Sequence, residues 1–220
     1  MNFSLTEEQR LIIQTANAFV VRELYPHEAE IETTGRLRPE LRDELRRKAI
    51  EAGLYAANMP AEIGGGGLDT LSWILFEKEI GRANYALHWT CVARPSNILL
   101  ACTGDQRERY LLPAVRGERM DALAMTEPDA GSDVRGMKCA AVRDGGDWVL
   151  NGSKHFISGP VMPDFAIVFA QTGVDETARG PRKRVTAFLV DVGTKGFDIA
   201  IGTKCVSYRG YHTFRLDFSD

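Results

Sequence analysis

In the first half of the chain, apolar residues recur every three or four positions, which is the spacing of one face of a helix. The first run begins after Thr6 and Gln9, which match the capping box T-x-x-Q that satisfies backbone N–H groups at a helix start. Pro26 is expected to end this helix, because proline removes a backbone donor and clashes with the preceding turn. The predicted apolar face consists of Leu11, Ile12, Thr15, Ala16, Phe19, Val20 and Leu24.

Three further helices are predicted before residue 120. The second begins near Pro39, a residue favoured in a first helical turn, and ends at Gly53. The third begins at Asp69, and the fourth runs from about Tyr85 to Cys102 with a kink at Pro95. The second helix is expected to bury Leu41, Leu45 and Ala49. The face of the third combines Leu71, Ile74, Leu75 and Lys78 with Trp73, Phe76 and Ile80.

After Gly117 the pattern changes to short apolar or alternating runs, which are typical of strands. Asp144–Asp147 reads D-G-G-D and predicts a hairpin turn, whereas the polar stretch Gly173–Lys183 is interpreted as a mobile loop. We therefore expect an α+β protein, with a helical domain over residues 1–120 and a strand domain over residues 121–220. The predicted strands are 123–126, 138–143, 148–150, 165–171, 185–190 and 213–218.

The composition is that of a globular protein with a substantial core, 44% hydrophobic and 26% charged over 220 residues. The net charge of −3 gives no reason to expect non-specific attraction to nucleic acid or to an anionic membrane. The four cysteines form no C-x-x-C pair and no histidine lies at metal-ligand spacing from them, so no metal site is predicted. The chain opens without the basic start and apolar run of a secretory signal, and no stretch is long enough to span a bilayer. We expect a cytoplasmic protein with reduced thiols.

The segment Met125–Asp133, M-T-E-P-D-A-G-S-D, follows a predicted strand and is the first candidate for chemistry. It supplies hydroxyls, small residues and free backbone N–H groups, so it can approach a phosphate closely and donate to it. Ordinary tight turns have the same composition, and the residues alone favour that simpler explanation.

The second candidate is Leu150–Gly159, in which a strand leads through a glycine turn into another strand. Residues two apart in a strand share a face, so Phe156 and Ser158 are expected to point the same way. Together they would offer a flat ring a stacking surface and a hydrogen bond. Core packing of Phe156 is the alternative that the residues alone favour. The four histidines form no cluster, and His88, inside an apolar run, is interpreted as a packed or hydrogen-bonded residue.

Three motifs carry a resemblance that covers the chain from about Leu5 to Asp220. They read AMTEPDAGSDV at Ala124–Val134, VLNGSKHFIS at Val149–Ser158 and, upstream, MPAEIGGGGLDT from Met59. In this order and spacing they resemble the N-terminal and middle domains of acyl-CoA dehydrogenases, flavoproteins of fatty acid and lipid metabolism. The resemblance implies an all-α N-terminal domain followed by an antiparallel β-barrel middle domain, with the family's C-terminal helical bundle absent from this sequence.

The resemblance implies an FAD site on the strand domain, with Ser132 also touching the CoA part of a substrate. Glu127 and Asp133 are interpreted as structural anchors of the loop. Asp129 stands where glycine is common in the family, and Phe156 stands where tryptophan is common. The implied cofactor-binding residues are Leu123, Ala124, Met125 and Thr126 along the flavin ring, Gly131 and Ser132 at the pyrophosphate, and Phe156, Ile157 and Ser158 against the outer side of the flavin.

In the family, a glutamate removes the α-proton of an acyl-CoA thioester, and the β-hydrogen passes as hydride to the flavin. That glutamate lies in the C-terminal domain, so no catalytic residue is assigned here and the fragment is expected to be inactive alone. The implied partners are an acyl-CoA substrate, an electron-transferring flavoprotein and, at full length, further copies in a homodimer or homotetramer. Two alternatives remain open: a flavin-dependent oxidase or monooxygenase of the same superfamily, and a non-enzymatic truncated module.

Overall fold

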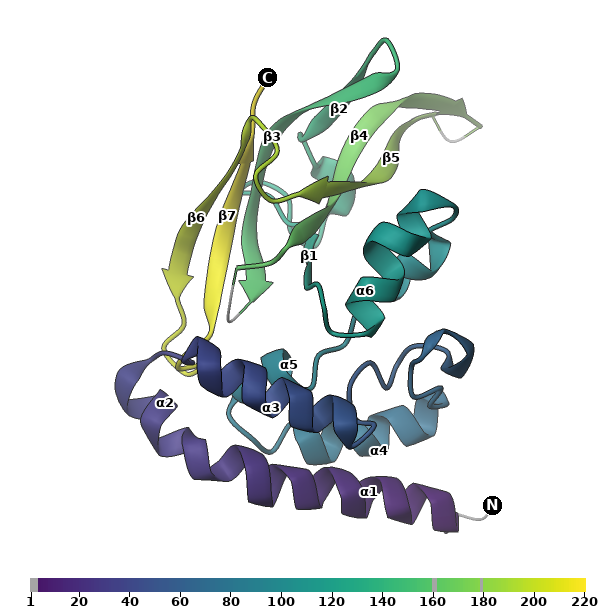
Figure 1. Cartoon of the computed structure of the whole chain (residues 1–220). Helices are drawn as coiled ribbons and strands as arrows, with labels where there is room; N and C mark the ends of the chain where they lie inside the picture. The colour runs from purple at the N-terminus through teal and green to yellow at the C-terminus, as the bar shows by residue number, and fades with distance from the viewer. Residues whose placement is uncertain (1–3, 160–161, 179) are drawn as a thin grey trace. The chain divides into compact units, whose positions relative to one another are not determined.

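The computed structural model describes residues 4–159, 162–178 and 180–220. The first three residues, on which the expected lack of a secretory signal partly rests, lie outside this range. The chain divides into two compact units, Met1–Met120 with Cys205–Tyr211, and Asp121–Lys204 with His212–Asp220. Helices build the first unit and a curled sheet builds the second, so the predicted fold class is confirmed (Figure 1).

The N-terminal helix α1 (Glu7–Phe19) begins at the predicted capping box. The Gln9 N–H donates to Thr6 Oγ1, and the Thr6 N–H donates to Gln9 Oε1, both at 3.1 Å. The expectation that Pro26 ends the helical course is wrong. A π-helical turn η1 (Val20–Leu24), a 3-10 turn η2 (Tyr25–His27) and helix α2 (Glu28–Thr34) continue it. Proline is tolerated in the first turn of η2. The helical course ends at Gly35, the C-cap of α2, which has φ of +66°.

The predicted face of the second helix is confirmed, whereas that of the third is confirmed only for Phe76 and Ile80. Helix α3 (Pro39–Glu51) buries Leu41, Leu45 and Ala49 as predicted. Helix α4 (Thr70–Ile80) is capped by Asp69 as predicted, but Leu71 and Ile74 are 52% and 56% exposed. Its buried face includes Phe76, Ile80 and Glu79. Leu11 of α1, also predicted to be core, is 55% exposed. Helical spacing identifies two apolar stripes on α4, and only the packing partner selects one of them.

The predicted fourth helix is wrong in its length. Helix α5 (Tyr85–Cys91) is short, residues 92–96 are not helical, and the 3-10 helix η4 (Asn97–Ala101) follows. Pro95 breaks the helix rather than kinking it, because proline drives the preceding residue, Arg94, away from helical geometry. The remaining helical pieces are η3 (Ala61–Ile63), η5 (Arg107–Leu111) and α6 (Leu112–Val115).

A short return of the chain, Cys205–Tyr211, completes the helical unit. Tyr208 stacks on Tyr85 of α5 at 4.9 Å between ring centroids, and Tyr211 meets the same ring edge-on at 4.7 Å. Gly210 has φ of +77°, and a Cβ there would lie 2.6 Å from Cγ2 of Ile31. Glycine is therefore required at this position both by the backbone and by the packing.

Among its described residues, the sheet unit has seven strands in the order β1-β4-β2-β3-β7-β6, with β5 paired to β4. Strand β1 pairs with β4 in parallel. The pairs β2–β3, β3–β7, β6–β7 and β4–β5 are antiparallel. The strands are β1 (Asp121–Ala124), β2 (Ala140–Asp144), β3 (Asp147–Gly159), β4 (Phe165–Thr177), β5 (Gly180–Asp191), β6 (Phe197–Lys204) and β7 (His212–Phe218).

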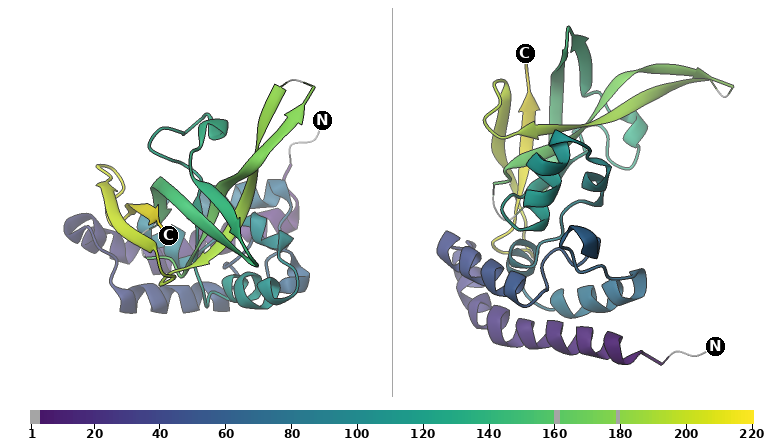
Figure 2. Two further views of the ribbon diagram at one scale, coloured as in Figure 1. Left: turned by 90° about the horizontal axis from the view of Figure 1, so that it is seen from above. Right: turned by 45° about the vertical axis from the view of Figure 1, so that its right-hand side comes forward.

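The turn at Asp144–Asp147 is confirmed, with φ of +57° at Gly145. The interpretation of Gly173–Lys183 as a mobile loop is wrong for its described residues, since β4 and β5 pair there as far as Thr177 and Gly180; Arg179 lies outside the described residues. Figures 1 and 2 show this hairpin extending from the rest of the sheet. The outer residues of this hairpin are mostly exposed and mostly polar. They therefore lack the apolar alternation that indicates a half-buried strand. Strand β6 was not predicted at all.

Candidate functional site

The two candidate motifs meet in the sheet unit, where the residues that join them lie 27 or 29 positions apart along the chain. Just after β1, the Thr126 carbonyl accepts a hydrogen bond of 2.8 Å from the His155 N–H of β3. The neighbouring Met125 carbonyl accepts one of 3.0 Å from Lys154 Nζ. The loop after β1 and the strand that carries Phe156 therefore form one structural element.

Glu127 anchors this junction. Its buried carboxylate accepts bonds from the Lys138 N–H at 2.5 Å, the Cys139 N–H at 3.0 Å and Lys154 Nζ at 2.8 Å. Burial raises the pKa of Glu127, but these donors outweigh burial and leave the pKa below its usual value. Glu127 is thus an ionised carboxylate whose oxygens are occupied, which makes it a poor proton acceptor and supports its interpretation as an anchor.

Apart from Ala130, which is buried, the rest of the loop is exposed. Backbone bonds between Glu127 and Ala130 close its first turn, at 2.9 and 3.2 Å. Gly131 and Ser132 follow on the surface, and a Cβ at Gly131 would meet no protein atom within 4 Å. Neither packing nor a left-handed φ requires glycine at 131, so the open space above it admits a ligand close to the backbone. Asp133 precedes a 3-10 turn that its side chain does not cap, and its role as an anchor stays a prediction.

Phe156 lies at an irregularity in β3. The pairing with β7 shifts register between Lys154 and Ile157, and Phe156 has φ of +55°, a left-handed conformation that costs a non-glycine residue about 1–2 kcal/mol. The Phe156 side chain is 55% exposed, Ser158 is also exposed, and Ile157 between them is buried. A strained, exposed aromatic residue beside an open loop is the kind of outlier that marks ligand sites.

The side chains of the other candidate residues likewise range from exposed to buried. Leu123 is 46% exposed, Met125 and Thr126 are half-buried, and Ala124 is fully buried. The side chains of Ala124 and Ile157 belong to the core of the sheet unit. These two residues offer a surface ligand only their backbone, whereas Leu123, Ser132, Phe156 and Ser158 also offer side chains.

Lys154 is the residue of this site that the sequence analysis missed. Its side chain is fully buried and pairs with Glu127, whose side chain is 4% exposed. A signal was present in the sequence, because Lys154 is the lysine of N-G-S-K, in a segment with the apolar pairs Val149–Leu150 and Phe156–Ile157 at its two ends. A buried lysine needs an anionic partner, and the sequence does not say which carboxylate provides it.

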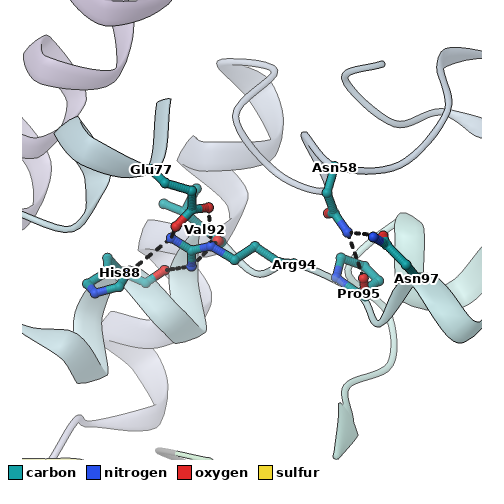
Figure 3. A network of polar contacts seen from close by, with 7 residues as sticks. All are labelled: Asn58, Glu77, His88, Val92, Arg94, Pro95 and Asn97. Atoms are coloured by element: carbon teal, nitrogen blue, oxygen red, sulfur yellow. Dashed lines mark hydrogen bonds and ion pairs between the residues drawn. The ribbon is translucent and has the colours of Figure 1, made fainter. Parts of the chain in front are cut away.

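A second polar network lies in the helical unit, around the break after α5 (Figure 3). The Arg94 guanidinium pairs with both carboxylate oxygens of Glu77, and its Nη2 lies 3.3 Å from Nδ1 of His88. Burial and, to a lesser extent, the charge of Arg94 together lower the pKa of His88 from 6.5 to about 3. His88 is therefore a neutral, packed residue, as predicted. Asn58 holds the segment from the other side, donating to the Pro95 carbonyl at 2.8 Å.

Within the described residues, no group of three or more histidine, cysteine or acidic side chains is placed to hold a metal ion. The same residues include no helix with the length and apolarity needed to cross a membrane.

Comparison with known protein families identifies both units. The family model of the acyl-CoA dehydrogenase N-terminal domain matches residues 6–118, and that of the acyl-CoA dehydrogenase middle domain matches residues 122–220. The chain belongs to the acyl-CoA dehydrogenase family. This confirms the resemblance inferred from the three sequence motifs.

Relatives within the family differ in their named reactions. The short-chain specific acyl-CoA dehydrogenase of Clostridium acetobutylicum is 33% identical over 224 residues, which cover 100% of this chain and 57% of that protein. The 3-(aryl)acrylate reductase of Clostridium sporogenes is 34% identical over 196 residues, covering 87% and 50%. A glutaryl-CoA dehydrogenase structure from Mycobacterium smegmatis in complex with FADH2 matches with a TM-score of 0.81 and 27% identity, covering 98% and 53%. The chain thus spans about half the length of these relatives.

Proposed function

We propose that this chain forms the N-terminal domain (residues 1–120) and the middle domain (residues 121–220) of an FAD-dependent acyl-CoA dehydrogenase. The observation that carries the proposal is the hydrogen bond from the His155 N–H to the Thr126 carbonyl. It joins an open loop with exposed backbone and hydroxyls to a strand that presents an exposed aromatic ring. Membership of the family and the FADH2 complex of the Mycobacterium smegmatis relative support the same assignment.

The residues present fit a dinucleotide flavin. The apolar surfaces of Leu123 and Phe156 suit the faces and edges of a planar ring, and the Ser158 hydroxyl suits a ring nitrogen. The open space at Gly131 and the exposed Ser132 hydroxyl suit a pyrophosphate. The ring is assigned to residues 123–126 and 156–158, the pyrophosphate to Gly131 and Ser132, and the CoA part of the substrate to Ser132.

Bound FAD supplies the acceptor for the hydride that leaves the β-carbon of the acyl-CoA. The chain's own residues bind and orient the flavin. Glu127 is not assigned as the base that removes the α-proton, because its carboxylate is buried and held by Lys138, Cys139 and Lys154. That base is assigned to a glutamate of the family's C-terminal helical domain. An electron-transferring flavoprotein is the proposed electron acceptor, and the full-length protein is proposed to assemble as a homodimer or homotetramer.

Reconstitution with FAD tests the cofactor site. We expect the chain to retain flavin absorbance after gel filtration in excess FAD, with weak affinity, and to lose affinity in the variants S132A and F156A. V142A is a matched control for F156A, since Val142 is 64% exposed on β2 of the same unit and lies outside the site. If the chain binds no FAD at saturating concentration, or if V142A weakens binding as much as F156A, the proposed site is wrong.

Anaerobic addition of butyryl-CoA to the FAD-loaded chain tests where the base lies. We expect no bleaching of the flavin. Bleaching would place a competent base within these 220 residues and contradict its assignment to a further domain. Rapid reaction of the photoreduced flavin with oxygen would favour the oxidase or monooxygenase alternative over the dehydrogenase.

A further inference from the structure

The buried Lys154–Glu127 ion pair carries a large desolvation cost, so it is an inefficient way to stabilise the sheet. The Lys154 side chain is fully buried and the Glu127 side chain is 4% exposed, so both charges have left water. The loss of hydration of two buried charges largely offsets their attraction, and an apolar pair of similar volume is often at least as stable. Around them the unit already has an apolar core that includes Ile157 and Leu216. Stability alone therefore gives little reason for an ion pair at this position.

What the pair does is connect three segments at one point. From β3, Lys154 Nζ reaches the Met125 carbonyl at the end of β1 and the Glu127 carboxylate in the loop. Glu127 in turn receives the N–H groups of Lys138 and Cys139, just before β2. Two residues beyond Lys154 lies Phe156 with its left-handed backbone. The ammonium thus holds together both walls of the proposed flavin site.

The bond to Met125 also sets the direction of a donor. In a trans peptide the C=O and the N–H point to opposite sides, and no cis peptide bonds are present among the described residues. Because the Met125 carbonyl points to the buried ammonium, the Thr126 N–H points away from it. A charged donor on the carbonyl also polarises the peptide, which strengthens its N–H as a donor.

We infer that Lys154 is a positioning residue of the flavin site, which aims and polarises the Met125–Thr126 peptide and holds the Phe156 bulge against the loop. The inference rests on the proposed FAD site. Lys154 acts through the peptide and the bulge, and Glu127 balances its charge. The pair is therefore a fixed charge arrangement behind the site, and removing either partner leaves the opposite charge next to it.

The direction in which the flavin reduction potential shifts in each variant distinguishes this role from a purely structural one. In K154M the carboxylate of Glu127 remains unbalanced and the polarised donor is lost, so the anionic reduced flavin is disfavoured. We expect FAD to bind on the order of tenfold more weakly, the usual size of effects from residues that orient a ligand's direct partners. A further tenfold loss for reduced over oxidised FAD makes the potential about 30 mV more negative. In E127Q the cation remains, and the potential is expected to move in the positive direction.

Three further variants keep the test decisive. K154R retains a cation and should restore part of the affinity and of the potential. The double variant K154M/E127L removes both charges, and it should fold even if K154M does not, while still binding FAD weakly. K195M is the matched control, because Lys195 is exposed between β5 and β6 of the same unit and lies outside the three segments that Lys154 joins; less than a twofold change is expected.

The measurements are FAD affinity by fluorescence quenching, flavin potential by dye equilibration, and thermal unfolding of the apo protein. Potentials that shift in the same direction in K154M and E127Q, or wild-type affinity in K154M/E127L, would overturn the inference and leave the proposed FAD site intact. If the wild-type chain itself binds no FAD, the proposed function fails and the inference fails with it.

Discussion

Acidification should destabilise this protein well before its carboxylates titrate, because the buried His88 has to be protonated when the helical unit unfolds. His88 is 5% exposed, its pKa is lowered from 6.5 to about 3 by burial and then by Arg94, and it is neutral in the folded protein. Between these two values the unfolded chain binds a proton at this residue that the folded chain does not. The contribution of His88 is therefore complete above pH 6.5 and is lost progressively as the pH falls towards 3.

The magnitude of this loss follows from how far the pH lies below the upper limit of this window, 6.5. Each pH unit below 6.5 removes about 1.4 kcal/mol from the free energy of unfolding, so the loss at pH 5 is about 2 kcal/mol. Carboxylates such as Glu79 and Glu127 also lose stabilisation as the pH falls, but only at lower pH than His88. Their pKa values are lowered from 4.5, so their stabilisation is lost as the pH falls below that value. The range from pH 7 to pH 5 therefore isolates the histidine.

Urea unfolding at pH 7, 6 and 5, followed by far-UV circular dichroism, measures this loss for the helices. The variant H88Q retains an oxygen that can accept from Arg94 but does not titrate in this range. We expect its pH dependence to be flatter than that of the wild type by about 2 kcal/mol between pH 7 and pH 5. H27Q is the matched control, because His27 belongs to the same unit and is only half-buried. Equal pH dependence in H88Q and the wild type would show that the network of Figure 3 does not hold a neutral histidine.

Three further substitutions test the backbone and the core. F156G relieves the left-handed strain at φ of +55°, so thermal stability should hold or rise by about 1 kcal/mol while FAD affinity falls; a loss of stability would contradict the strain argument. G210A places a Cβ 2.6 Å from Ile31 and should cost at least about 2 kcal/mol in urea unfolding, whereas an unchanged midpoint would mean that the 205–211 return does not pack as described. L45A should cost about 2–5 kcal/mol because Leu45 is fully buried, and L11A should cost less than about 1 kcal/mol because Leu11 is 55% exposed; similar losses would invalidate the assignment of the α1 and α3 faces.

Several features of the fold could be predicted because they depend on neighbouring residues. The Thr6–Gln9 capping box, the Asp69 cap and the turn at Gly145 are each decided within a few positions of the chain. The strands at 165–171 and 213–218 were found because both are rich in apolar residues and buried on at least one side. By contrast, β6 was missed although F-D-I-A-I alternates, because glycines and polar residues border it and its outer positions are exposed.

The candidate site was predictable in its residue types, through the two motifs and their resemblance to a family, but not in its construction. Nothing local to Lys154 names Glu127 as its partner, and nothing local to Phe156 reveals its positive φ. Both depend on the register between β3 and β7 and on the loop after β1, which are long-range arrangements.

By itself, the sequence determined where helices begin, where glycine must turn the chain and which residue types are available at the two candidate motifs, because these depend on short-range sterics and hydrogen bonds. The tertiary structure alone decided which stripe of α4 is buried and that the helix beginning at Tyr85 stops as early as Cys91. It also decided that one buried ammonium ties three segments together. A side chain's burial and its ionic partner are properties of the surfaces that meet, and residues far apart in the chain supply those surfaces.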